Sequence, residues 1–194
     1  IKIEYKNNGT DTLSFHWWGK LQQERQVVPT TAFYNGLLAH WDMNSERDPD
    51  GNALPTGARL HDNSGKRLDA FMVPDATLST SGKINEALEL DGTSHYAQAG
   101  KLAIGSAMSV SVWVRPTSTT GTRTIIADST PVSGGPTGWS INVVNGTALN
   151  TNLNGENNTV SSALTVNAWN LVTVTWDGST VRRYVNGNPV GTHY

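Results

Sequence analysis

The chain has 194 residues, of which 37% are hydrophobic and 15% are charged, and it contains no cysteine. Its 14 basic and 16 acidic residues give a formal net charge of −2, which excludes the strongly basic surface typical of nucleic-acid-binding domains. No stretch approaches the roughly 20 apolar residues of a membrane-spanning helix, so we expect no membrane insertion. Because residue 1 is Ile rather than Met, we expect the segment to come from a longer protein.

The first residues have the pattern of a β-hairpin. Apolar side chains occupy every second position over residues 1–5 and again over residues 13–17, as in strands that bury one face. Asn8 and Gly9 between the two segments are favoured in tight hairpin turns. We therefore predict two antiparallel strands here.

Short alternating segments continue from Gly36 onwards, and the first of them predicts a strand over residues 38–43. They are clearest at residues 108–115 and 169–176, and Asp-Gly or Asn-Gly turns follow at residues 177–178 and 186–187. Helical periodicity is nearly absent, and its best candidate, residues 82–90, equally fits a turn that enters a strand. Strands spaced by roughly 8–12 residues indicate an all-β sandwich or barrel.

An ordered set of motifs extends over most of the chain. It comprises GLLAHW at 36–41, HDNSG at 61–65, GK at 82–83, ALELDG at 87–92, SVSVWVRP at 109–116, WNLVTVTWDG at 169–178 and YVNG at 184–187. This order resembles the laminin-G-like family of concanavalin A-like jelly rolls in bacterial surface proteins. The resemblance implies an antiparallel β-sandwich over residues 35–194. Family members usually continue beyond the last hairpin, so we expect this domain to be truncated.

Residues 1–34 have a different character. They contain IKIEY at 1–5, LSFHWW at 13–18, VVP at 27–29 and FY at 33–34. These segments resemble the last strands of a protective-antigen-like β-sandwich, a family that often binds carbohydrate in adhesins and glycosidases. No binding residue carries over, because the part that would hold the binding loops is absent. Two incomplete sandwiches would leave sheet edges open, and open edges predict self-association.

Acidic residues suggest calcium at either of two places. The loop over residues 42–52 holds four carboxylates and two amides within eleven residues, and calcium takes six to eight oxygen ligands. Alternatively, Asp42, Asp62 and Asp91 stand at strand ends, where jelly rolls of the resembling family often hold a structural calcium. We select these three as the candidate metal ligands. Each also has a purely structural interpretation, as a capping residue of its own turn.

The sequence contains seven tryptophans, whose flat rings can stack on sugar rings. Alternation predicts that most are core, namely Trp41, Trp113, Trp169 and Trp176. Trp139 follows a Gly-rich loop and is expected at a rim. Trp18 is adjacent to Trp17 and therefore points to the opposite face of the strand. Trp139 and Trp18 are our candidate ligand contacts.

Catalytic motifs are not found. The histidines are isolated, and no nucleophile elbow or phosphate loop occurs. A retaining glycosidase needs two carboxyl groups about 5–5.5 Å apart, and Glu89 with Asp91 is the only pair at alternate positions of a strand-like segment. This pair also fits the structural motif of the resembling non-catalytic family. The sequence therefore predicts that the chain is not an enzyme.

The leading functional hypothesis is a non-catalytic binding or adhesion module of a large secreted or cell-surface protein. Its expected partner is carbohydrate or a surface protein, with structural calcium as a cofactor. One alternative is a structural spacer in an adhesive stalk or filament. The other is an accessory domain of a polysaccharide-degrading enzyme.

Overall fold

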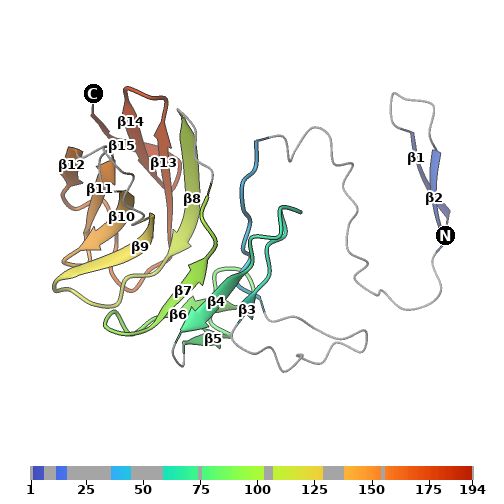
Figure 1. Ribbon diagram of the computed structural model, residues 1–194, viewed down its shortest axis with the longest axis horizontal. Coiled ribbons are helices and arrows are strands. Elements are labelled where there is room, and N and C mark those ends of the chain that lie inside the picture. Colours follow the sequence, from blue (N-terminus) through green and yellow to red (C-terminus); the bar gives the residue numbers. More distant parts are fainter. Residues whose placement is uncertain are drawn as a thin grey trace.

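The computed structural model describes residues 2–6, 12–16, 36–44, 59–73, 76–102, 107–128, 138–153 and 156–193 (Figure 1). The described residues form strands and turns and contain no helix. Trp18 and residues 45–52 of the acidic loop lie outside them. No helix in the described part is long and apolar enough to cross a membrane.

Two four-stranded antiparallel sheets form the larger part of the described fold. In the first sheet the order is β12 (Glu156–Val160), β11 (Ala148–Leu153), β10 (Trp139–Val144) and β9 (Thr122–Asp128). In the second sheet it is β15 (Asn188–His193), β14 (Val181–Val185), β13 (Asn170–Trp176) and β8 (Met108–Val114). Figure 1 shows the two sheets as facing layers, so the predicted all-β sandwich is confirmed.

Three smaller sheets precede the sandwich in the chain. β3 (Arg59–Leu60), β4 (Ala70–Val73) and β7 (Tyr96–Ala99) form one of them, and β5 (Thr77–Ser79) pairs with β6 (Ala87–Glu89) in another. The third is the predicted N-terminal hairpin of β1 (Lys2–Lys6) and β2 (Thr12–His16). Residues 82–90 form a turn that enters β6, which is the non-helical alternative.

The sandwich core follows directly from strand alternation. Successive side chains of a strand point to opposite faces, so Val172 and Val174 of β13 face inwards and are fully buried. Ile141 and Leu149 of the opposite sheet are equally buried and belong to the same cluster. A second, smaller cluster forms around Leu60, Ala70 and Met72 in the three-stranded sheet.

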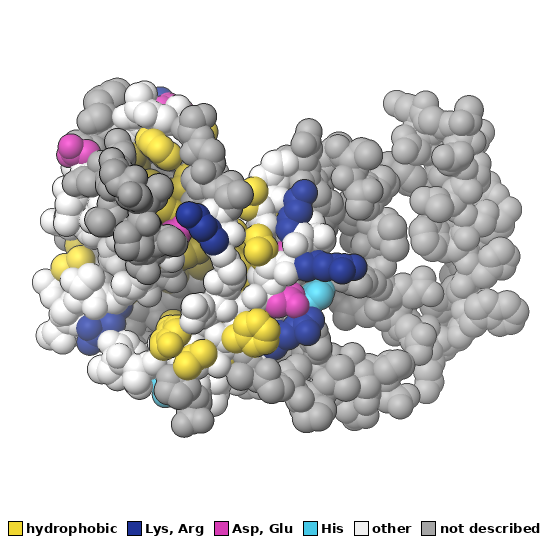
Figure 2. Space-filling view, in the orientation of Figure 1, with side chains coloured by type: hydrophobic (Ala, Val, Ile, Leu, Met, Phe, Trp, Pro, Cys, Tyr) yellow, Lys and Arg dark blue, Asp and Glu magenta, His cyan; other side chains and the backbone are white. Residues whose placement is uncertain are grey.

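Apolar side chains on the surface occur in separate groups. On the face drawn in Figure 2, hydrophobic side chains stand in small groups between polar and charged ones. The exposed large hydrophobic residues of the described chain are Phe71, Ile84, Leu90, Tyr96 and Trp113. Trp113 was expected in the core, but its position on β8 faces away from the opposite sheet. It is 37% exposed, and the Lys83 ammonium lies 4.9 Å from its ring centre.

Replacing Val174 by alanine should lower the free energy of unfolding by about 2–3 kcal/mol, because two buried methyl groups are lost and a cavity remains. Its neighbour Thr173 faces the other way and is the matched control. We expect Thr173→Ala to change stability by less than about 1 kcal/mol. Urea unfolding of both variants measures the difference, and equal effects would contradict the assigned faces.

Candidate functional site

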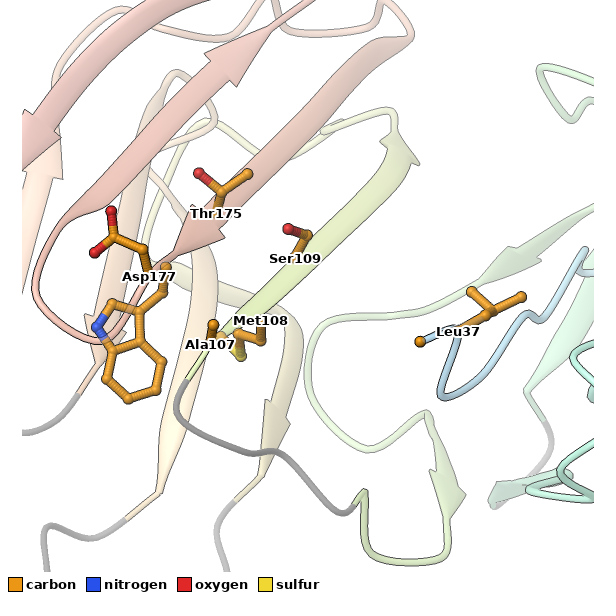
Figure 3. A pocket seen from close by; sticks show the side chains of 8 residues that line it. Leu37, Ala107, Met108, Ser109, Thr175 and Asp177 are labelled. Atoms are coloured by element: carbon orange, nitrogen blue, oxygen red, sulfur yellow. The ribbon is translucent and has the colours of Figure 1, made fainter. Parts of the chain in front are cut away.

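An open cavity lies where β8 begins and β13 ends (Figure 3). Its volume is about 580 Å³. The antiparallel register places Ser109 opposite Thr175 and Met108 opposite Trp176. Figure 3 shows Leu37 on a separate segment across from Ser109, so the wall is built from parts distant in sequence. The lining residues are Gly36, Leu37, Ala107, Met108, Ser109, Thr175, Trp176 and Asp177.

The cavity combines an indole, two hydroxyl groups and a carboxylate. Ser109 and Thr175 are directly opposite one another in the β8–β13 ladder, so their hydroxyl-bearing side chains share one face of the sheet. Trp176 packs against the sandwich core while it also lines the cavity. Asp177 follows as the first residue of the turn after β13. The Ser109 and Thr175 hydroxyls and the Asp177 carboxylate can hydrogen-bond a ligand, whereas the Trp176 side chain, one position after Thr175, faces the core side of the sheet.

Asp177 is held in place by its own turn. Its Oδ2 accepts a hydrogen bond from Arg182 Nη1 at 2.6 Å, and its Oδ1 accepts from the amides of Thr180 at 2.8 Å and Ser179 at 3.1 Å. The Arg182 guanidinium and these amides hold the pKa of Asp177 well below its usual range. The side chain is 48% exposed, so a fixed negative charge stands at the edge of the cavity.

Among the predicted metal ligands, Asp62 is the most buried, with only 2% of its surface exposed. Its carboxylate accepts hydrogen bonds from the amides of His40 at 2.8 Å, Ser64 at 2.9 Å and Leu68 at 2.9 Å, and from the Ser64 hydroxyl at 2.7 Å. Burial by itself would raise the pKa of Asp62, but these donors together lower it. Asp62 therefore fastens residues 38–41 to the loop at residues 61–68.

Asp91 also satisfies its carboxylate within its own turn. Oδ1 accepts from the amides of Thr93, Ser94 and His95, each at 2.9 Å. Oδ2 accepts from the hydroxyls of Thr93 at 2.6 Å and Ser94 at 2.8 Å. The Thr93 hydroxyl and these amides hold the pKa of Asp91 far below its usual range. Because Asp91 stays ionised, it cannot serve as the proton donor of a glycosidase pair with Glu89.

Asp42 is exposed, and its Oδ1 accepts one hydrogen bond, from the Asn44 amide at 3.1 Å. In the described residues, the structure brings no three His, Asp or Glu side chains together as a metal would need, so Asp42, Asp62 and Asp91 do not converge in it. Calcium would have to compete with the protein donors at Asp62 and Asp91. Calcium binding stays a prediction.

The two predicted tryptophan contacts have different outcomes. Trp139 begins β10 and packs against the sandwich core, and its indole N–H is buried and has no hydrogen-bond partner among the described residues. Trp18 lies outside the described residues. Both remain predictions as ligand contacts. Strand alternation predicted Trp176 in the core, and its position directly before the Asp177–Gly178 turn is the signal that it also lies at the end of the sheet.

The comparisons with known proteins agree with this fold. Residues 91–194 match the family model of the laminin G type, described as the concanavalin A-like lectin/glucanases superfamily. The match covers more than half of the chain, and the chain therefore belongs to this family. A comparison with curated proteins finds no match.

Two solved structures share the fold. The binding domain of Paraclostridial Mosquitocidal Protein 1 is 16% identical with a TM-score of 0.52, over 71% of this chain and 38% of that one. A tryptophan-to-alanine mutant of HCR/D is 19% identical with a TM-score of 0.51, over 69% of this chain and 35% of that one. The chain thus spans well under half the length of either structure. At sequence identities this low, the structural similarity shows a common fold alone.

Replacing Asp62 by asparagine should destabilise the protein by about 2–4 kcal/mol at neutral pH, because buried donors lose a charged acceptor. The folded-state pKa of Asp62 lies below its ordinary value of 3.8. The stabilisation by the ionised Asp62 carboxylate is therefore fully present above pH 3.8 and is lost as the pH falls through the lowered folded-state pKa. Thermal melts from neutral to acidic pH should show the gap between wild type and variant narrowing only at the acidic end. Asp42→Asn, at an exposed carboxylate, is the control, and a gap that does not depend on pH would contradict this role.

The calcium prediction requires that calcium raise the melting temperature and that excess chelator lower it, because an ion that binds only the native state must stabilise it. Asp42→Asn should abolish the rise in melting temperature on adding calcium. It should leave the melting temperature of the chelator-treated protein unchanged. Calorimetry on both proteins measures this effect. A melting temperature unaffected by chelator would rule out a tightly bound structural ion.

Proposed function

We propose that the chain is a non-catalytic carbohydrate-binding module of a secreted or cell-surface protein. The observation that carries the proposal is the cavity at the β8–β13 strand ends, which is lined by two hydroxyl-bearing side chains and an ionised carboxylate. Membership of the concanavalin A-like lectin/glucanases superfamily supports it. So does the fold shared with a toxin's binding domain.

Recognition would divide between apolar and polar contacts. Sugars present an apolar ring face and a rim of hydroxyl groups, so Leu37 would contact the former. Asp177 would accept hydrogen bonds from ligand hydroxyls, because its charge is fixed and half of its side chain is exposed. Ser109 and Thr175 would both donate and accept. The rigid β8–β13 ladder would position these groups before the ligand arrives.

The catalytic alternative lacks support at the one carboxylate pair that the sequence offered. Asp91 makes five hydrogen bonds inside its own turn and stays ionised. An ionised Asp91 could act only as the nucleophile or base of such a pair, and both of its oxygens are already held by these donors. The same cavity therefore serves binding without bond cleavage in this proposal.

Filling the cavity tests the proposal. We expect Ser109→Leu to weaken binding at least about tenfold for any glycan that the wild type captures on an array, because the leucine side chain occupies ligand space. Ser111→Leu is the matched control, since Ser111 is on the same exposed face of β8 but outside the cavity lining. Titration calorimetry with the captured glycan measures both.

Three outcomes are distinguishable in this experiment. Loss of binding in Ser109→Leu alone supports the site. Equal binding by both variants and wild type would move carbohydrate recognition away from the cavity. If the wild type captures no glycan, the proposal fails and the spacer alternative is favoured.

A further inference from the structure

The cavity at the ends of β8 and β13 has two walls that are built differently. Ser109 and Thr175 belong to paired strands of the sandwich, so the β8–β13 ladder fixes their relative position. Leu37 lies across from Ser109 in Figure 3 and lines the same cavity. Residues 37–40 are part of the described chain but belong to no strand. The Leu37 wall is therefore held by something other than a sheet.

Asp62 holds this wall from the loop at residues 61–68. Its Oδ1 accepts a hydrogen bond at 2.8 Å from the amide of His40, which lies three residues after Leu37. The carbonyl oxygen of His40 accepts a hydrogen bond from the Asn63 amide at 2.7 Å. Both polar groups of the His40 backbone are thus bound to two adjacent residues of the loop.

The same carboxylate also fixes the loop from which it acts. Its second oxygen, Oδ2, accepts hydrogen bonds from the Ser64 hydroxyl at 2.7 Å and from the Leu68 amide at 2.9 Å. The carbonyl oxygen of Leu68 accepts from Trp41 Nε1 at 2.8 Å. Asp62 is buried, and hydrogen bonds to an ionised acceptor are strongest where water is excluded. One buried carboxylate therefore joins both ends of the loop to the segment that carries Leu37.

This arrangement has a consequence for ligand binding. Groups that are positioned before a ligand arrives give higher affinity, because binding does not then have to order them. In an Asp62→Asn variant, one carboxylate oxygen becomes an NH₂ group, which cannot accept from the amides and hydroxyl that surround it. The segment would lose hydrogen bonds to the loop, and Leu37 would no longer keep one position relative to Ser109. A ligand would then have to order the wall, and its affinity would fall.

We propose that Asp62 is a positioning residue of the carbohydrate cavity, which acts through the His40 amide to hold Leu37 at a fixed distance from the β8–β13 wall. This inference rests on the proposed carbohydrate-binding function and adds to it a residue that does not touch the ligand. Asp62 is not among the residues that line the cavity, so its effect on affinity has to pass through the segment that it holds.

A double-mutant cycle tests this coupling. Titration calorimetry measures Kd for the glycan that the wild type captures, using wild type, Asp62→Asn, Leu37→Ala and the double variant below the melting temperature of each. We expect Asp62→Asn to raise Kd at least about fivefold. In the Leu37→Ala background the same substitution should change Kd less than about twofold, because the wall that Asp62 positions is already absent.

Asp91→Asn is the matched control for the cycle. Asp91 also accepts hydrogen bonds from backbone amides and hydroxyls, but all of them lie within its own turn, and it is not among the cavity-lining residues. Its Kd should equal that of the wild type. The proposal is overturned if Asp62→Asn binds as tightly as Asp91→Asn, or if the effects of Asp62→Asn and Leu37→Ala multiply in the double variant.

A second measurement detects the positioning without any ligand. Because the sequence has no cysteine, His40→Cys and Asn188→Cys together give two unique sites for spin labels. Both positions are exposed, the first on the segment that Asp62 holds and the second on β15 of the sandwich. Pulsed electron paramagnetic resonance should show a narrow distribution of label distances in the wild-type and Asp91→Asn backgrounds and a broad one with Asp62→Asn.

The two measurements separate this inference from the function on which it rests. An equally narrow distance distribution with Asp62→Asn would overturn the positioning role, whatever the protein binds. A broad distribution together with a wild type that captures no glycan would support the positioning of Leu37 and reject carbohydrate as the ligand. Ser64→Ala removes one donor to Asp62 and keeps its charge. It should give a smaller effect in both measurements, and it replaces Asp62→Asn if that variant does not fold.

Discussion

The two sheets of the sandwich are held together by inward-facing side chains that alternate along each strand. Val172 and Val174 of β13 meet Ile141 and Leu149 of the opposite sheet, and all four are excluded from water. Every other feature of the C-terminal half depends on this register, because a shift by one residue would exchange the two faces of a strand. The cavity wall at Ser109 and Thr175 and the interior position of Arg183 are both set by it.

Three aspartates of the described residues hold the backbone of nearby loops in place. Asp62, Asp91 and Asp177 each accept hydrogen bonds from backbone amides a few residues ahead, and Ser or Thr hydroxyls add to them. These bonds favour the ionised form and fix the backbone after a strand or bridge. At Asp177 the same geometry leaves a charged group at the rim of the cavity. A turn-forming residue can thereby contribute to recognition without any change in its structural role.

Buried polar side chains of the sandwich differ in how completely they are hydrogen-bonded. Asn170 is buried but satisfied, since its amide group bonds to the backbone of Thr165 and Ala168. Arg183 is equally buried, and among the described residues its guanidinium donates only to the Thr151 hydroxyl. The two side chains, on adjacent strands, thus differ in how fully their polar atoms are hydrogen-bonded in the described part of the chain.

Most strands, their turns and the family could be predicted from the sequence, because period-two alternation and Asn-Gly or Asp-Gly turns are local signals. Residues 38–43, predicted as a strand, contribute only a bridge between Trp41 and Asp62, since pairing needs a partner that local pattern cannot specify. Three features depend on the tertiary structure: Trp113 is exposed, Asp177 lines a cavity together with Leu37, and Arg183 is buried. Each of these depends on which strands become neighbours, and long-range contacts leave no trace in local periodicity.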